Sequence, residues 1–170
     1  MAGATHGGGV VFRLGDSGPL YLLVEASRSK GRWVLPKGGI DRRESAEQAA
    51  VREVAEEAAV LARVVKALGR ARLEKGGGRI QVEFFLMEYV RDAKPCESRE
   101  IRWCRFQKAI EALDDAEAIR LLHRANELVG AALPSPRPGG AAARAARAAL
   151  ATLPLGLLAI LIAGRCCFPG

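Results

Sequence analysis

The sequence predicts an α/β domain in which helices cover a mixed β-sheet. Strand-like runs dominate the first hundred residues, one helix interrupts them, and further helices come last. The composition, 49% hydrophobic and 26% charged, is that of a soluble globular domain. About 130 residues precede a Pro/Gly-rich stretch, and that length can bury one core. We therefore expect one domain over residues 1–133, followed by a tail of different character over residues 134–170.

Short apolar runs bounded by turn residues predict the first strands. Val10–Leu14 and Leu20–Glu25 are strand-like, and the Gly-Asp-Ser-Gly-Pro stretch at residues 15–19 suits a hairpin connection. Trp33–Leu35 is a third apolar run, and it leads through Pro36 into a glycine-containing loop. This half of the chain therefore predicts two paired strands and a short third one.

A helix follows the loop. Ser45 is a suitable N-cap and Gln48 stands three residues later, so this stretch forms a capping box. The helix is expected to run from about residue 46 to about residue 59. After it, the runs 62–74 and 79–90 predict two longer strands around a Lys-Gly-Gly-Gly turn. A strand over 101–106 and helices over 108–113 and 115–129 complete the pattern.

Acidic residues cluster in the last two turns of the predicted helix. Glu53, Glu56 and Glu57 stand at i, i+3 and i+4, so their carboxylates share one surface. Their mutual repulsion and the helix dipole each disfavour this arrangement by roughly 0.3 to 1 kcal/mol per charge. A hard cation with oxygen ligands reverses that sign, and magnesium is the natural candidate. The plain alternative is the solvated acidic face of an ordinary amphipathic helix.

Arg52 and the preceding loop favour the metal interpretation. Arg52 could brace Glu56 at i+4 or Glu44 across the loop, and so hold a carboxylate ready for ligation. Glycines at 38 and 39 allow the backbone to approach a ligand closely.

At these residues the chain resembles the Nudix (MutT-like) hydrolase family. The family signature is Gly, five residues, Glu, seven residues, Arg-Glu, an aliphatic residue, any residue, Glu-Glu, any residue, Gly and an aliphatic residue. One position departs from it, because Ala59 stands where the family has glycine, which costs freedom in the turn leaving the helix. The matching residues are Gly38, Glu44, Arg52, Glu53, Val54, Glu56, Glu57 and Val60.

The resemblance implies an α/β/α sandwich around a central mixed sheet, and hydrolysis of a pyrophosphate bond in a nucleoside diphosphate linked to another group. It implies Mg²⁺ as the cofactor, with Mn²⁺ as a possible substitute. In the family the general base is a box glutamate or one from a later loop, so Glu53 is the first candidate, Glu100 the second and Glu97 a further one. Glu44 is expected to hold the loop. The expected metal ligands are Gly38 through its carbonyl, Glu53, Glu56 and Glu57, and the expected catalytic residues are Glu53, Glu57, Arg52 and Glu100.

The substrate is expected to be a small phosphorylated molecule. The stretch from Gly31 to Gly38 looks like the family branch that handles dinucleoside polyphosphates and diphosphoinositol polyphosphates, and a basic rim suits such polyanions. Arg32, Lys37 and Gly39 are the expected substrate-binding residues. A nucleotide-sensing regulator without turnover, a nucleoside triphosphate sanitising pyrophosphatase and a membrane-tethered scaffold remain alternatives. Aromatic residues that could stack on a base, or pack in the core instead, are Phe12, Phe84, Phe85, Tyr89 and Trp103.

More than half of the net positive charge lies in the tail. Four arginines and no acids follow residue 133, so the tail supplies +4 of the net +7 and leaves the body near +3, which argues against a nucleic-acid partner. Residues 148–164 are uncharged and could contact a membrane, although this length is marginal for a span. Four cysteines show no metal spacing, and the N-terminus shows no signal-peptide pattern, so a cytoplasmic location is expected, with membrane association as the alternative. The pattern does not predict the oligomeric state.

Overall fold

The computed structural model describes residues 3–75, 77–94 and 99–132, and its contacts divide the chain after Asn126. The first of these two units ends at Asn126 and holds all the described strands. The elements in chain order are β1 (His6–Gly15), β2 (Gly18–Ala26), β3 (Ser29–Val34), β4 (Lys37–Gly39), α1 (Ala46–Ala58), β5 (Val60–Lys75), β6 (Gly78–Asp92), β7 (Ile101–Arg105), α2 (Phe106–Ala112) and α3 (Ala116–Ala132).

The described strands form one mixed sheet. The order along it is β3-β2-β1-β6-β5, with β4 paired to β1 and β7 paired to β2. Only the β1–β6 pairing is parallel, and the other described pairings are antiparallel. The predicted strands are confirmed, although β1 and β3 each begin four residues before the predicted runs. Strand β3 ends at Val34, before Leu35, and Phe106, which was predicted to end a strand, begins α2. The three-residue strand β4 was not predicted, because Lys-Gly-Gly carries no strand signal of its own and only its pairing with β1 defines it.

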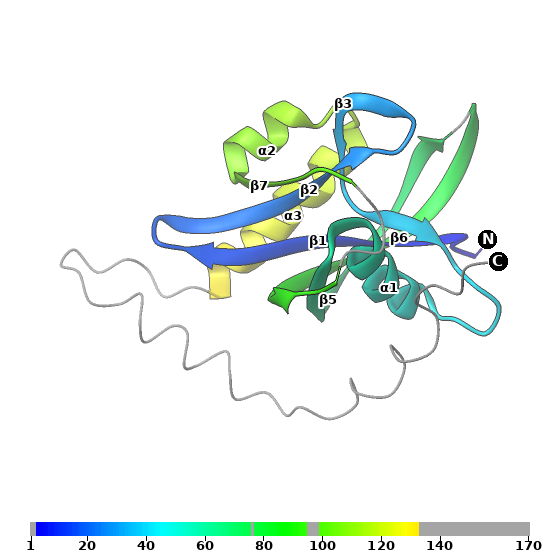
Figure 1. Ribbon diagram of the computed structural model, residues 1–170, viewed down its shortest axis with the longest axis horizontal. Coiled ribbons are helices and arrows are strands. Elements are labelled where there is room, and N and C mark those ends of the chain that lie inside the picture. Colours follow the sequence, from blue (N-terminus) through cyan, green and yellow to red (C-terminus); the bar gives the residue numbers. More distant parts are fainter. Residues whose placement is uncertain (1–2, 76, 95–98, 133–170) are drawn as a thin grey trace. The chain divides into compact units, whose positions relative to one another are not determined.

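Helix α1 covers one face of the sheet and can lie close to it because glycines follow the first residue of β1. A Cβ built on Gly7 would stand 2.2 Å from the Ala46 carbonyl oxygen, so any side chain there would push the helix away. Farther along, Val54 packs with Val11 and Met87 in a buried apolar cluster. The helix that carries the carboxylates is therefore fixed against the centre of the sheet (Figure 1).

Helices α2 and α3 cover the opposite face of the sheet (Figure 1). The Tyr21 ring of β2 meets Phe106 of α2 edge to face, and the Tyr21 hydroxyl donates a hydrogen bond of 2.9 Å to the Asn126 side chain of α3. Phe106 in turn meets His123 edge to face. Helices on both faces of a mixed sheet confirm the α/β/α sandwich.

The ends of α1 follow the sequence closely. Ser45 accepts from the Gln48 amide and the Gln48 side chain accepts from the Ser45 amide, which confirms the capping box. At the other end Ala59 adopts the left-handed conformation, with φ 51° and ψ 40°. That conformation costs a residue with a Cβ roughly 1–2 kcal/mol, which explains why glycine suits this position.

The predictions for the tail, including membrane contact through residues 148–164, lie outside the described residues. No helix within the described part of the chain is long and apolar enough to cross a membrane.

Candidate active site

The glycine loop and α1 meet at one point, where the backbone of Gly38 faces the carboxylate of Glu53. A Cβ on Gly38 would stand 1.9 Å from the carboxyl carbon of Glu53 and 2.0 to 2.2 Å from its oxygens. Strand β4 holds this glycine in place through its pairing with Gly7 of β1. The neighbouring Gly39 has open space at the same position. The signature therefore needs glycine at position 38 for steric reasons.

Arg52 lies at the centre of a carboxylate network on α1 and the loop. Its Nε and Nη2 each donate to Glu44 at 2.9 Å, and its Nη1 donates to Glu53 at 2.7 Å and to Glu56 at 2.9 Å. Its Nη2 also donates to the Gly39 carbonyl at 2.7 Å. Arg52 thus contacts both partners that the sequence suggested, Glu44 and Glu56, and it also contacts Glu53.

Glu44 fixes the loop as expected. Its Oε2 accepts the Asp41 amide at 2.9 Å in addition to the Arg52 hydrogen bonds. Burial acts to raise the pKa of Glu44, but the Arg52 hydrogen bond, the Asp41 amide and the Arg52 charge together hold it below its ordinary value. Glu44 is therefore an ionised structural link between the loop and the helix.

Among the residues that the structure describes, Glu57 is the charged residue that is buried, with 5% of its surface exposed. Its Oε1 pairs with the Arg99 guanidinium at 2.8 Å, and its Oε2 accepts the Lys37 backbone amide at 3.1 Å. Burial raises the pKa of Glu57 to about 7; Arg99 and Lys37 act to lower it, while the nearby Glu53 charge adds to the rise. The electrostatic influence of Glu53 indicates that the two carboxylates lie in one region.

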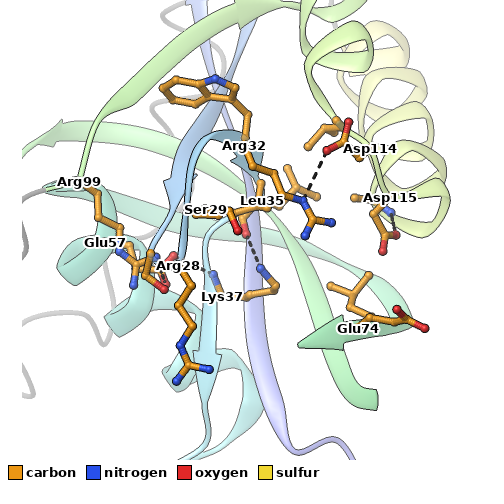
Figure 2. A pocket seen from close by; sticks show the side chains of 17 residues that line it. Arg28, Ser29, Arg32, Leu35, Lys37, Glu57, Glu74, Arg99, Asp114 and Asp115 are labelled. Atoms are coloured by element: carbon orange, nitrogen blue, oxygen red, sulfur yellow. Dashed lines mark hydrogen bonds and ion pairs between the residues drawn. The ribbon is translucent and has the colours of Figure 1, made fainter. Parts of the chain in front are cut away.

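A cleft of about 330 Å³ opens beside Glu57. Figure 2 shows Glu57 and Arg99 on one side of it, Arg32 with Asp114 on the other, and Lys37 between them. Four cationic side chains and four acidic ones line the cleft. These are Arg28, Arg32, Lys37 and Arg99, and Glu57, Glu74, Asp114 and Asp115.

Two acidic residues that line the cleft across from Glu57 already have partners in the protein. Asp114 pairs with Arg32 at 3.4 Å, and both side chains are substantially exposed. Asp115 caps α3, because its Oδ1 accepts the amides of Glu117 and Ala118. Glu57, in contrast, is contacted by the Arg99 guanidinium and the Lys37 amide.

The structure brings most of the predicted site residues together. Arg32 and Lys37 both line the cleft that Glu57 enters. Gly39 does not line it, and its carbonyl serves Arg52 instead. Glu100 has an exposed side chain and accepts the Glu25 amide through its backbone at 2.9 Å. Glu97 lies outside the described residues.

Sequence reasoning missed Arg99 and Asp114, because both reach the cleft only through the fold. Their approach depends on the β2–β7 pairing and on the bridge between Trp33 and Leu113. Among the candidate stacking aromatics, Phe12, Phe84 and Phe85 are buried in the core. Trp103 meets Tyr89 edge to face and carries the Arg13 guanidinium on its ring. Trp33, which was not among the candidates, lines the cleft. The Arg102 guanidinium is stacked on its ring, with Cζ 4.0 Å from the ring centroid.

The carboxylates do not converge as a ready metal centre. Within the residues that the structure describes, no three His, Cys, Asp or Glu side chains are grouped to hold an ion. Cationic partners account for this arrangement, because Arg52 binds Glu53 and Glu56 while Arg99 binds Glu57. An incoming cation would have to replace guanidinium groups at these oxygens or share the oxygens with them.

Comparison with known proteins agrees with this geometry. The model of the NUDIX domain matches residues 5–125. Two crystal structures of C. elegans Ap4A hydrolase are similar: one shares 25% identity over 75% of this chain and 98% of that one, with a TM-score of 0.61. The other, a binary complex, shares 24% identity over 76% and 99%, with a TM-score of 0.63.

The NUDIX domain of Shewanella oneidensis NrtR, complexed with ADP ribose, shares 23% identity over 75% of this chain and 89% of that one, with a TM-score of 0.62. None of the curated protein sequences compared with this chain matches it. The signature residues, the sandwich and the domain match over residues 5–125 together show that the chain belongs to the Nudix hydrolase family.

Proposed function

We propose that this protein is a magnesium-dependent pyrophosphohydrolase that cleaves dinucleoside polyphosphates or related polyanions. The observation that carries the proposal is the cleft, which joins the box carboxylate Glu57 to four cationic side chains. A pyrophosphate bond must lie beside the metal ligands, and the remaining phosphates need positive partners along the same path.

The donor chemistry suits a hard divalent cation. Glu53, Glu56 and Glu57 offer carboxylate oxygens on adjoining turns of one helix, and the absence of a Cβ at Gly38 leaves its backbone against Glu53. These residues, with the Gly38 carbonyl, would hold Mg²⁺, and Mn²⁺ could substitute for it. When bound, the ion supplies charge for the phosphate oxygens and lowers the pKa of a coordinated water.

We assign the general base to Glu53. Arg52 orients its carboxylate at 2.7 Å, and the Gly38 backbone closes one side of it, so its oxygens are held in a defined direction. Glu100, the second candidate, has an exposed side chain and does not line the cleft, which makes it the weaker choice. Arg52 then acts as a positioning residue for the whole carboxylate set.

The cationic side chains would bind the phosphate chain. Lys37 and Arg99 lie next to Glu57 and suit the scissile pyrophosphate, while Arg28 and Arg32 line the same cleft from the β2–β3 turn and β3. Trp33 also lines the cleft, and the Arg102 guanidinium is stacked on its ring. A substrate with three or more phosphates would use more of these cations than ADP-ribose would. Similarity to an Ap4A hydrolase is in keeping with this substrate class.

A substrate panel tests the proposal. Diadenosine polyphosphates, nucleoside triphosphates, ADP-ribose and diphosphoinositol polyphosphates would each be incubated with Mg²⁺ or Mn²⁺, and product release measured. We expect kcat/KM to rise with the number of phosphates, and Arg28→Gln and Arg32→Gln to reduce that rise. Arg120→Gln is the surface control, since Arg120 pairs with Glu117 and neither residue lines the cleft, and it should not change that rise. Nucleotide binding without turnover would instead favour the regulator.

A further inference from the structure

Glu57 is held by a cation that comes from outside the signature. Arg99 precedes β7 and reaches across to Oε1 of Glu57 at 2.8 Å, while the Lys37 amide takes Oε2 (Figure 2). Both oxygens of this buried carboxylate are therefore engaged by the protein itself. Any divalent cation that Glu57 binds must displace or share one of these partners.

The two guanidinium groups of the site contact different groups. Arg52 stands within α1 and donates to three carboxylates and to the Gly39 carbonyl, so its place is fixed by hydrogen bonds on several sides. Arg99 stands two positions before β7, and its side chain, 19% exposed, lines the cleft. Of the two, only Arg99 contacts the space where phosphate groups would lie.

A guanidinium group and a divalent cation compete for one carboxylate oxygen. The positive charges of a guanidinium group and a divalent cation repel each other when both lie against the same carboxylate oxygen. A guanidinium also binds phosphate as well as it binds carboxylate, with the same two-pronged geometry. Movement from Glu57 to a phosphate oxygen would relieve the repulsion and keep the Arg99 charge paired.

We propose that Arg99 is a positioning residue that holds Glu57 in the metal-free protein and pairs with a substrate phosphate once the cation is bound. This inference rests on the proposed function. Arg99 then opposes cation binding in the free protein and supports phosphate binding in the loaded protein. Cation and phosphate therefore bind cooperatively, because each favours the same position of Arg99.

Calorimetric titration with Mn²⁺ alone tests whether Arg99 opposes cation binding in the free protein. Arg99→Gln should bind Mn²⁺ about 5-fold or more tightly than wild type, the lower end of typical coupling between sites. Arg28→Gln removes the same charge from the same cleft without contacting Glu57, and should stay within about twofold. Arg99→Lys keeps the charge and should also stay near wild type. Unchanged or weaker Mn²⁺ binding in Arg99→Gln would overturn the proposal.

A non-hydrolysable diphosphonate tests whether Arg99 supports phosphate binding in the loaded protein. With Mn²⁺ at saturation, Arg99→Gln should bind methylene diphosphonate about 5-fold or more weakly than wild type, and Arg99→Lys should recover part of the loss. Equal diphosphonate binding in Arg99→Gln and wild type would also overturn the proposal. Thermal unfolding of each variant without metal checks the fold. Arg99→Met, which also removes the charge and should show the same two changes, carries the test if Arg99→Gln does not fold.

Glu57→Gln separates this inference from the proposed function. If Glu57→Gln binds Mn²⁺ as tightly as wild type, Glu57 is not a ligand and the proposed metal site itself fails. If Glu57→Gln loses Mn²⁺ binding while Arg99→Gln does not gain it, the metal site stands and only the role of Arg99 is refuted.

Discussion

The backbone of Gly38 lies directly against the side chain of Glu53, so that a Cβ on Gly38 would stand 1.9 Å from the carboxyl carbon. Real Cβ atoms do not come this close to another heavy atom, and either the loop or Glu53 would have to move. Because Glu53 also receives Arg52, its displacement would disturb the whole carboxylate set.

Gly38→Ala should therefore abolish Mn²⁺ binding and hydrolysis while leaving the sheet folded. Gly39→Ala is the matched control, since the same atom there meets nothing within 4 Å and should leave Mn²⁺ affinity near wild type. Calorimetric titration and circular dichroism of both variants make the comparison. Equal Mn²⁺ affinity in the two variants would refute the steric argument.

Glu44 should make stability depend on pH in a defined direction. Its pKa is lower in the folded protein than in the unfolded chain, so its stabilisation is present above the unfolded value and is lost as pH falls through the folded one. At pH 7, Glu44→Gln should lower the free energy of unfolding by about 1.5–3 kcal/mol, the range for a hydrogen bond to a charged group. Urea unfolding at pH 7 and in acid measures the difference, which should shrink in acid.

Glu47→Gln is the control for Glu44, because Glu47 is an exposed acid in the first turn of the same helix. Its effect should be about 0.5 kcal/mol or less. A Glu44→Gln deficit of the same size at neutral and acid pH would show that the lost stability comes from shape and not from the ionised carboxylate.

Ala59→Gly should stabilise the protein. Ala59 holds φ 51°, where a Cβ is strained and glycine is not. Part of the relief is offset because glycine makes the unfolded chain more flexible, which leaves a net gain of about 0.5–1 kcal/mol. Urea unfolding measures it, and Ala55→Gly in the interior of α1 should instead destabilise by about 1 kcal/mol. A loss of stability in Ala59→Gly would contradict this account of the departure from the signature.

Local signals predicted much of the fold and the part of the site that lies on the glycine loop and α1. The capping box at Ser45, the helix that follows it and the long strands each carry their own pattern, and the structure confirms them. Strand β4 was missed because its pairing with β1, not its composition, makes it a strand. The bracing of Glu44 and Glu56 by Arg52 could be anticipated because these residues lie within one loop and one helix.

The other part of the site, which contains Arg99 and Asp114, depends on contacts between residues far apart in the sequence. Arg99 stands 42 positions after Glu57 and reaches it only because β7 pairs with β2. Asp114 reaches Arg32 because Leu113 bridges to Trp33 beside it. No spacing rule links such residues, so the sequence could name the carboxylates but not the cation that Glu57 pairs with.

The central claim is that Glu57 and its neighbouring carboxylates support metal-dependent pyrophosphate hydrolysis, and the most direct test is turnover of diadenosine tetraphosphate by wild type and Glu57→Gln with and without Mg²⁺. We expect turnover that requires the metal and falls by more than about 100-fold in the variant, which exceeds the loss typical for an outer partner of a metal site. Wild-type turnover without metal, or equal turnover by Glu57→Gln, would contradict the claim.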